Sequence, residues 1–213
     1  MARANEANPV TSPESKTQAE RVAASDQAMI AAAIDLILER GTNHTTLSAI
    51  GERAGYSRGL ATYRFGSKAG LFEEVVNTIQ RRWVGYLNTA VGEQTGAAAL
   101  SAAADAYYRF VTDAPKDIRV LHILYYGGAS PNGELRGISK QAFARQIADA
   151  ERWITDGIAD GSVRDDISPR TAATQYVAHI AGITYIWLLN PSQLDFADIH
   201  REFIRTLSEQ LAP

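Results

Sequence analysis

Hydrogen-bond donors are concentrated in one short stretch of the sequence, between Thr46 and Lys68. Their side chains are hydroxyls, guanidinium groups and one ammonium group, all of which donate to phosphate oxygens or to the edges of bases. Together with the glycine and the leucine between them, these candidate residues are Thr46, Ser48, Ser57, Arg58, Gly59, Leu60, Thr62, Tyr63, Arg64 and Lys68. Their chemistry is that of anion binding and base recognition.

Two short helices joined by a glycine turn would present these donors on one side. Ile50 lies on the apolar face of the first helix, Gly55 is placed to turn the chain, and Ser57 is placed to cap the second helix. Leu60 and Phe65 are expected to anchor the second helix from behind. A helix-turn-helix presents its second helix to the major groove in this way. The stretch therefore predicts binding to double-stranded DNA.

Charge is distributed unevenly along the sequence. The formal net charge is −3, so the protein is not a basic protein that binds nucleic acid nonspecifically through its overall charge. From residue 40 to residue 68, five basic residues stand against one acidic residue, namely Arg40, Arg53, Arg58, Arg64 and Lys68 against Glu52. This local excess suits a small nucleic-acid footprint. A second interpretation remains open, in which the arginines only solvate a helical face.

The apolar periodicity predicts an all-α protein of about nine helices, since no segment alternates as a β-strand does. Helices are expected from about Gln18 to Arg40, in the two motif segments, and from about Lys68 to Val91. The remaining helices are expected near residues 97–112, 117–127, 134–160, 169–189 and 195–211, with breaks at glycine and proline.

Three regions follow from this pattern. Residues 1–17 are expected to form a disordered tail, because they lack large hydrophobic groups apart from Met1 and Val10. Residues 18–68 are expected to form the DNA-binding domain, with the motif itself at about 46–65. Residues 69–213 are expected to form a helical domain for effector binding and dimerisation.

The last two helices point to a second copy of the chain. Between Ala172 and Leu189, apolar side chains appear on nearly every side, and such a helix has to be covered on both faces. We expect a two-fold four-helix bundle between protomers. Its interface residues would be Ile183, Ile186, Trp187, Phe203, Leu207 and Leu211. The alternative is that both helices lie at the centre of a monomeric core.

Aromatic and histidine side chains in the larger region are candidates for a ligand pocket. The full set is Trp83, Tyr86, Tyr107, Tyr108, Phe110, His122, Tyr125, Tyr126, Phe143, Trp153, Tyr176 and His179. Small-molecule pockets are mostly apolar and aromatic with a few polar groups. Seven of these lie on the helices best placed for a ligand, namely Tyr107, Phe110, His122, Tyr126, Phe143, Tyr176 and His179. The same residues could instead be ordinary core.

The segment from about Ala28 to Val75 resembles the DNA-binding domain of the tetracycline-repressor (TetR) family of bacterial transcription regulators. The resemblance rests on Gly41, Thr45, Thr46, Ile50, Ala54, Gly55, Ser57, Gly59, Phe65, Lys68 and Leu71. A looser likeness lies in the segment GIADGSVRDDISP, from Gly157 to Pro169, which looks like the turn between helices seven and eight of many members.

The resemblance implies a role for each motif position. Thr46 would contact phosphate, Ser48 sits where some relatives reach a base, and Arg58 with its two neighbours would read base edges. Most relatives have tyrosine where this chain has Thr62, so Tyr63 becomes the expected backbone contact and the role of Thr62 is open. Lys68 would hold the phosphate backbone from the start of the connecting helix.

The resemblance also implies a mode of action. The protein would bind a palindromic operator as a homodimer, act as a repressor, and be released by a small hydrophobic or aromatic effector. Two alternatives stay open, namely an activator and a regulator controlled by a protein partner.

Other classes of function find little support in the sequence. The four histidines, His44, His122, His179 and His200, show no metal-ligand spacing, and there is no cysteine. No nucleophile motif or phosphate loop is present, so we expect neither an enzyme nor a metal or other cofactor. No apolar run approaches a membrane span, and the N-terminus has no apolar signal core, so we expect a cytoplasmic protein with no membrane partner.

Overall fold

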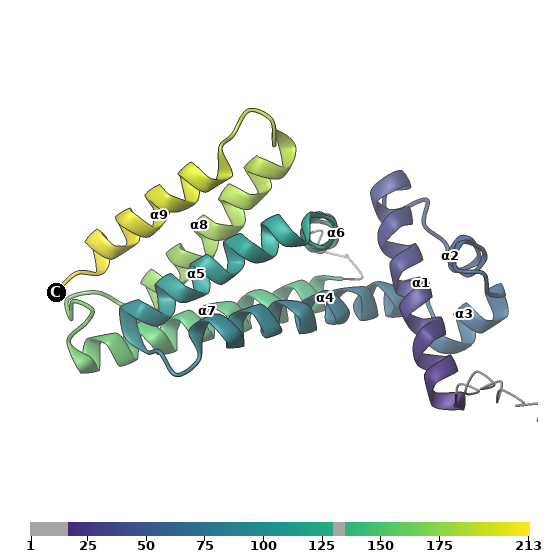
Figure 1. Ribbon diagram of the computed structural model, residues 1–213, viewed down its shortest axis with the longest axis horizontal. Coiled ribbons are helices and arrows are strands. Elements are labelled where there is room, and N and C mark those ends of the chain that lie inside the picture. Colours follow the sequence, from purple (N-terminus) through teal and green to yellow (C-terminus); the bar gives the residue numbers. More distant parts are fainter. Residues whose placement is uncertain (1–16, 130–134) are drawn as a thin grey trace, which may run out of the picture.

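Nine helices and no strand make up residues 17–129 and 135–213, the part of the chain that the computed structural model describes (Figure 1). The prediction of an all-α protein is confirmed. The expected tail, apart from Thr17, and the expected helix start at residue 134 lie outside the described residues. The helices are α1 Gln18–Arg40, α2 Leu47–Arg53, α3 Arg58–Phe65, α4 Lys68–Val91, α5 Gly96–Asp113, α6 Pro115–Gly127, α7 Arg136–Asp160, α8 Pro169–Leu189 and α9 Phe196–Leu211.

Local signals explain where the first helices begin and end. Thr17 and Glu20 form a capping box at the start of α1, and Gly41 ends this helix with a φ of 73°. Ser67 caps α4 by accepting a hydrogen bond from the Gly70 amide at 3.0 Å. Each of these signals lies within a few residues of the helix end that it sets.

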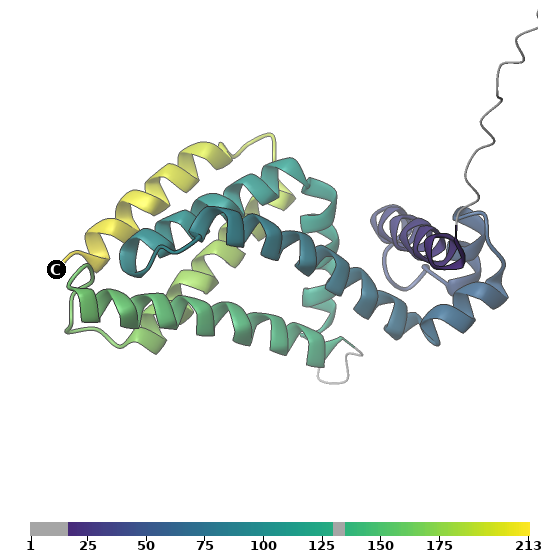
Figure 2. The same ribbon diagram turned by 60° about the horizontal axis from the view of Figure 1, so that its bottom comes forward.

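The helices form a small head and a longer body. The head contains α1, α2 and α3, with α2 and α3 on the side away from the body (Figures 1 and 2). The helix α4 runs from the head into the body, where α5, α7, α8 and α9 pack together, and α6 lies at the end of the body nearest the head. One helix therefore belongs to both parts.

Two apolar clusters hold the molecule together. The first is continuous from the head into the body, from Met29 and Ile37 of α1 through Ile79 of α4 to Leu124 of α6. The second joins α5, α7, α8 and α9 at the far end of the body. Because the first cluster crosses the junction, the head and the adjoining part of the body share a core.

Ion pairs also cross the junction. The Arg82 guanidinium of α4 lies 2.6 Å from the Asp117 carboxylate of α6, and the Lys116 ammonium group of α6 lies 3.0 Å from the Asp35 carboxylate of α1. The helix α6 is thus tied both to α4 and to the head. Among the described residues, no helix combines the length and the hydropathy that crossing a membrane requires.

Candidate nucleic-acid interface and ligand cavity

The helix-turn-helix is fixed by two hydroxyl caps and a glycine turn. The Thr46 hydroxyl oxygen accepts from the Ala49 amide at 3.2 Å, and the Ser57 hydroxyl oxygen accepts from the Leu60 amide at 3.1 Å. Gly55 has a φ of 77°, which a residue with a side chain rarely adopts. Because each capping oxygen uses a lone pair toward its own helix, its O–H stays available to donate outward to a phosphate.

Close backbone packing holds the motif against its neighbours. The Tyr56 amide donates to the Gly51 carbonyl at 2.7 Å, and a Cβ on Gly51 would come within 3.0 Å of the Ser57 carbonyl oxygen. A Cβ on Gly70 would overlap the Phe65 carbonyl oxygen. The two motif helices and α4 therefore approach more closely than side chains at these glycines would allow.

Most of the predicted DNA-contacting residues lie exposed on the head. Tyr63 is the extreme case, with 82% of its surface exposed. The other exposed ones are Thr46, Ser48, Ser57, Arg58, Gly59, Thr62 and Arg64. Arg58 has no hydrogen-bond or ion-pair partner in the part of the chain that the structure describes. Its guanidinium is free to bind an external acceptor.

Arg64 differs from Arg58 because the protein already uses its guanidinium. Its Nε donates to Asp26 Oδ1 of α1 at 2.8 Å, and its Nη2 pairs with the second oxygen of the same carboxylate. Hydrogen bonding to Asp26 raises the pKa of Arg64. Arg53 is held in the same way, by Glu39 of α1 at 2.8 and 2.9 Å. The free positive charge of the motif is therefore smaller than the count of basic residues suggests.

The side of α3 that faces the core contains one residue that sequence reasoning missed. Ala61 is completely buried, whereas Leu60 and Phe65, the expected anchors, are only half-buried. Lys68, also half-buried, lies 5.6 Å from the centre of the Phe72 ring and 3.5 Å from the Asn43 carbonyl oxygen. Its ammonium group is therefore held near the start of α4, with donors to spare.

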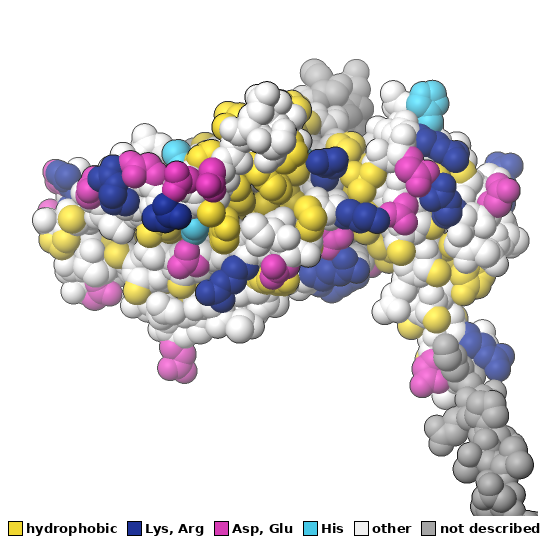
Figure 3. Space-filling model, turned by 45° about the horizontal axis from the view of Figure 1, so that its top comes forward, with side chains coloured by type: hydrophobic (Ala, Val, Ile, Leu, Met, Phe, Trp, Pro, Cys, Tyr) yellow, Lys and Arg dark blue, Asp and Glu magenta, His cyan; other side chains and the backbone are white. Residues whose placement is uncertain are grey.

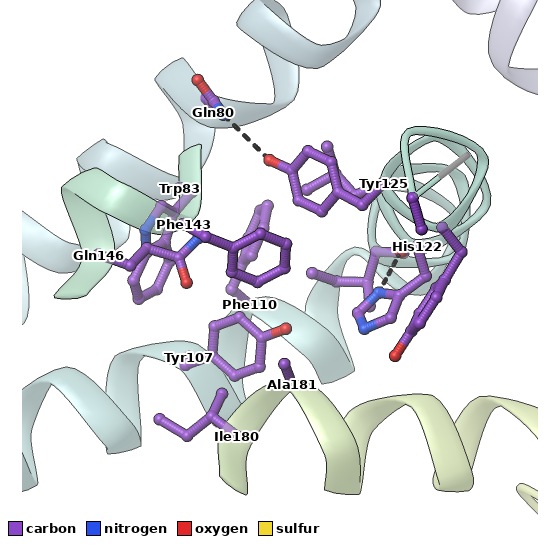
Figure 4. A pocket seen from close by; sticks show the side chains of 14 residues that line it. Gln80, Trp83, Tyr107, Phe110, His122, Tyr125, Phe143, Gln146, Ile180 and Ala181 are labelled. Atoms are coloured by element: carbon purple, nitrogen blue, oxygen red, sulfur yellow. Dashed lines mark hydrogen bonds between the residues drawn. The ribbon is translucent and has the colours of Figure 1, made fainter. Parts of the chain in front are cut away.

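A cavity of about 200 Å³ lies in the body, between α4, α5, α6, α7 and α8 (Figure 4). Its walls are mainly aromatic and aliphatic, and within the described part of the chain no Asp, Glu, Lys or Arg side chain lines them. The lining residues are Gln80, Trp83, Tyr107, Phe110, Ile118, Leu121, His122, Tyr125, Tyr126, Ala129, Phe143, Gln146, Ile180 and Ala181. This composition suits an apolar, ring-bearing molecule.

A few polar groups interrupt the apolar walls. The Gln80 side-chain amide donates to the Tyr125 hydroxyl oxygen at 3.0 Å, and His122 Nδ1 lies 3.0 Å from the Ile118 carbonyl oxygen (Figure 4). Burial raises the pKa of Tyr107 to about 12 and also raises the pKa of Tyr125. Both hydroxyls therefore stay protonated at neutral pH.

Five of the seven predicted ligand-binding residues meet in this cavity, namely Tyr107, Phe110, His122, Tyr126 and Phe143. The other two lie elsewhere. The Tyr176 hydroxyl donates to the Leu100 carbonyl at 3.0 Å inside the second apolar cluster, and the exposed His179 stacks on Phe203. Burial, with a smaller effect from Asp105, raises the pKa of Tyr176.

Sequence reasoning missed two polar residues of the cavity, Gln80 and Gln146. Glutamine is common on exposed helix faces and gives no signal of its own. The only signal in the sequence is indirect: Gln80 lies three residues before Trp83, and Gln146 lies three residues after Phe143, so each shares a helix face with an aromatic side chain.

The predicted dimer residues divide into two groups. Ile186 is 55% exposed, and its neighbour Leu189 is 61% exposed, while Ile183 and Phe203 are half-buried. Leu207 and Leu211 are buried in the core of the chain itself, and Trp187 stacks on Phe196 with ring centres 4.8 Å apart. Figure 3 shows hydrophobic side chains gathered in the middle of one face of the body, beside a row of charged side chains.

Comparison with known proteins gives the following matches. Residues 29–75 match the family described as bacterial regulatory proteins, tetR family. A search of the curated proteins gave no match.

Three similar solved structures share the fold. A putative TetR-family transcriptional regulator from Rhodococcus sp. is 20% identical with a TM-score of 0.73, and the match covers 89% of this chain and 100% of that one. NalD, the secondary repressor of the MexAB-OprM multidrug efflux pump in Pseudomonas aeruginosa, is 23% identical with a TM-score of 0.74, over 91% and 98%. FadR from Bacillus subtilis, solved in complex with stearoyl-CoA, is 17% identical with a TM-score of 0.75, over 87% and 98%.

Proposed function

We infer that the protein is a sequence-specific DNA-binding regulator of transcription, most simply a repressor, because residues 29–75 match the family of bacterial regulatory proteins called tetR. The observation that supports this best is the exposed face of α3. It combines the unpaired Arg58 guanidinium with the exposed Tyr63, and the exposed capping hydroxyls of Thr46 and Ser57, at the starts of α2 and α3, each keep a proton to donate. A surface of this kind matches a phosphate backbone and the base edges beside it.

Each residue of this face has a proposed role. Arg58, at the start of α3, reads a guanine, and Gly59 lets the helix backbone approach the groove. Thr46, Ser57, Tyr63 and Lys68 bind phosphates, and Ser48 and Thr62 lie close enough to the same backbone to add contacts. Leu60 and Arg64 serve the interface indirectly, since Leu60 packs against the first core cluster and Arg64 is paired with Asp26.

We propose that the DNA-binding form is a homodimer. The exposed Ile186 and Leu189, with the half-buried Ile183 and Phe203, form an apolar surface on α8 and α9 that a second copy would cover. Two heads would then meet successive major grooves about 34–36 Å apart, and the operator would be palindromic. Leu207 and Leu211 support this surface from within the chain, because they are already buried.

We propose that the cavity binds a small apolar or aromatic effector that releases the DNA. Two similar proteins were solved with small molecules, namely SmeT with triclosan and FadR from Bacillus subtilis with stearoyl-CoA. In this chain the cavity wall includes α4, whose first residue is Lys68 of the head, and α6, which is paired with α1. A ligand with unequal affinity for two arrangements of these helices would shift the protein between them.

The test begins with the full-length protein and a random library of DNA duplexes. Selected duplexes should share a palindrome, and sedimentation should show a dimer at micromolar concentration. Fluorescence anisotropy should then show that a hydrophobic compound which stabilises the protein also lowers its affinity for the selected duplex. If the selection enriches no sequence, the proposed regulator is contradicted. If a monomer binds the palindrome with full affinity, the proposed dimer is contradicted. If the DNA is released only when another protein is added, the regulator responds to a protein partner and not to a small effector.

A further inference from the structure

Among the residues that the structure describes, 17–129 and 135–213, no charged side chain lines the cavity to receive a charged ligand. Its polar side chains are two glutamines, one histidine, three tyrosines with their hydroxyls, and Trp83 with its indole N–H. Arg145 donates a hydrogen bond to Oε1 of the lining residue Gln80 at 3.3 Å. Arg145 itself is exposed and does not line the cavity. Burying an unpaired ion in an apolar site costs several kcal/mol or more. An uncharged ligand avoids this desolvation penalty.

His122 offers the cavity an acceptor, not a donor. Its Nδ1 lies 3.0 Å from the Ile118 carbonyl oxygen, and a carbonyl can only accept, so we assign the ring hydrogen to Nδ1 on the geometry of this contact. Burial lowers the pKa of His122, against a smaller opposing effect from the carbonyls of Ile118 and Ala181, so the ring is neutral at pH 7. Nε2 then has a lone pair that can accept a hydrogen bond.

The Tyr107 hydroxyl adds a second acceptor. Tyr107 is hydrogen-bonded to Thr184, whose own hydroxyl proton goes to the Ile180 carbonyl at 2.8 Å. The proton shared between the two hydroxyls is therefore that of Tyr107, and the Tyr107 oxygen keeps a lone pair. Figure 4 shows this hydroxyl pointing toward the side of the cavity where the His122 ring lies, with Ala181 next to the hydroxyl.

The size of the cavity limits the rest of the ligand. An engineered protein cavity of about 150 Å³ accommodates a single benzene ring. The present cavity, at about 200 Å³ and walled by Trp83, Phe110 and Phe143, is suited to one or two rings. Edge and face contacts to three aromatic side chains favour a flat molecule.

We propose that the cavity binds an uncharged molecule of one or two rings that donates a hydrogen bond, from a phenolic O–H or an aryl N–H, to His122 Nε2, with Tyr107 Oη as a second acceptor. The proposal deepens the proposed function, because it rests on this cavity being the effector site. It names the chemistry that separates an effector from other hydrophobic compounds.

Four matched probes test the proposal on the full-length protein by titration calorimetry at pH 7.5. They are 4-phenylphenol, biphenyl, 4-methoxybiphenyl and biphenyl-4-carboxylate. The phenol should bind about 5- to 10-fold more tightly than its methyl ether, because one net hydrogen bond is gained. The carboxylate should bind most weakly. Equal affinity for phenol and ether, strongest binding of the carboxylate, or no binding by any probe would each overturn the proposal.

A variant of His122 tests whether its Nε2 is the acceptor behind the preference for the phenol over the ether. In His122→Phe the ring volume is kept and Nε2 is lost, so the ratio of phenol to ether affinity should fall below about 2-fold. Tyr125→Phe is the matched control, because it removes a cavity hydroxyl that accepts from Gln80, and it should keep the phenol preference. An unchanged ratio in His122→Phe overturns the assignment. The comparison of probes on the unmodified protein remains decisive if either variant fails to fold.

The same probes separate this proposal from the proposed function. Anisotropy of a labelled operator duplex reports release, and calorimetry reports binding. A phenol that binds preferentially but releases no DNA contradicts the effector role and supports the cavity chemistry. Release by all uncharged probes alike supports the effector role and overturns the requirement for a donor.

Discussion

Arg58 and Arg64 lie six residues apart on the same short helix, yet the structure predicts opposite consequences for their loss. Arg58 is exposed and has no partner in the described ranges 17–129 and 135–213, so Arg58→Ala removes nothing that the fold uses. Two nitrogens of Arg64 bind the Asp26 carboxylate, so Arg64→Ala removes an ion pair that joins α3 to α1.

The magnitudes follow from these environments. A bidentate contact to guanine provides about 1 to 3 kcal/mol of discrimination, so Arg58→Ala should weaken binding to the selected operator by roughly 5- to 150-fold per half-site. Its unfolding free energy should change by less than about 0.5 kcal/mol. The Arg64 side chain is only 30% exposed and that of Asp26 26%. Their paired geometry lies between that of exposed and buried ion pairs, so Arg64→Ala should lower Tm by roughly 2 to 8 °C.

Thermal unfolding and anisotropy on operator and random duplexes measure both effects. Asp26→Ala is the control for Arg64→Ala, because it breaks the same ion pair and leaves the Arg64 guanidinium free. We expect Asp26→Ala to lower Tm as Arg64→Ala does. The reasoning is refuted if Arg64→Ala weakens operator binding at unchanged Tm while Asp26→Ala keeps full affinity, since Arg64 would then be a direct contact.

Three further predictions address packing, assembly and pH. In Gly157→Ala the new Cβ would overlap the Val163 side chain, so the unfolding free energy should fall by about 1 to 3 kcal/mol in a denaturant titration; Gly85→Ala, with open space around its Cβ, should lose none. Ile186→Glu should give a folded monomer in sedimentation, and a dimer of unchanged affinity would contradict the proposed interface. Because burial lowers the pKa of His122, the unfolded state binds more protons, so stability is full above about pH 6.5 and falls at lower pH. Replacing His122 by Phe should flatten the dependence of unfolding free energy on pH between 7 and 5.

Helix positions could be predicted from the sequence because their signals are local. The helix α1 begins at Gln18 and ends at Arg40, as its apolar spacing and Gly41 indicate, and α4 begins at Lys68 after the capping Ser67. Caps and periodicity act within four residues of the helix end that they set. Such signals do not depend on how the helices are later packed.

The composition of the cavity could be predicted only in part, because it depends on how each helix is rotated in the packed body. Tyr107 and Tyr176 look equivalent in the sequence, but one faces the cavity while the other donates to the Leu100 carbonyl. The partner of Arg64 is 38 residues away, so its spacing within α3 could not show that it was occupied. The apolar period of α9 likewise fits burial by its own chain at Leu207 as well as burial by a partner.

The junction between head and body determines what a ligand in the cavity could change. The helix α6 contributes His122, from its middle, to the cavity wall and Asp117, from its first turn, to the pair with Arg82 of α4. Asp117 is only 6% exposed, so pulling its carboxylate away from Arg82 without another partner would leave a buried charge uncompensated. Lys116 binds Asp35 of α1 at the same place. We therefore expect α6 to move together with α4 and the head, so that a shift of the cavity wall changes the position of α3 rather than being absorbed at the junction.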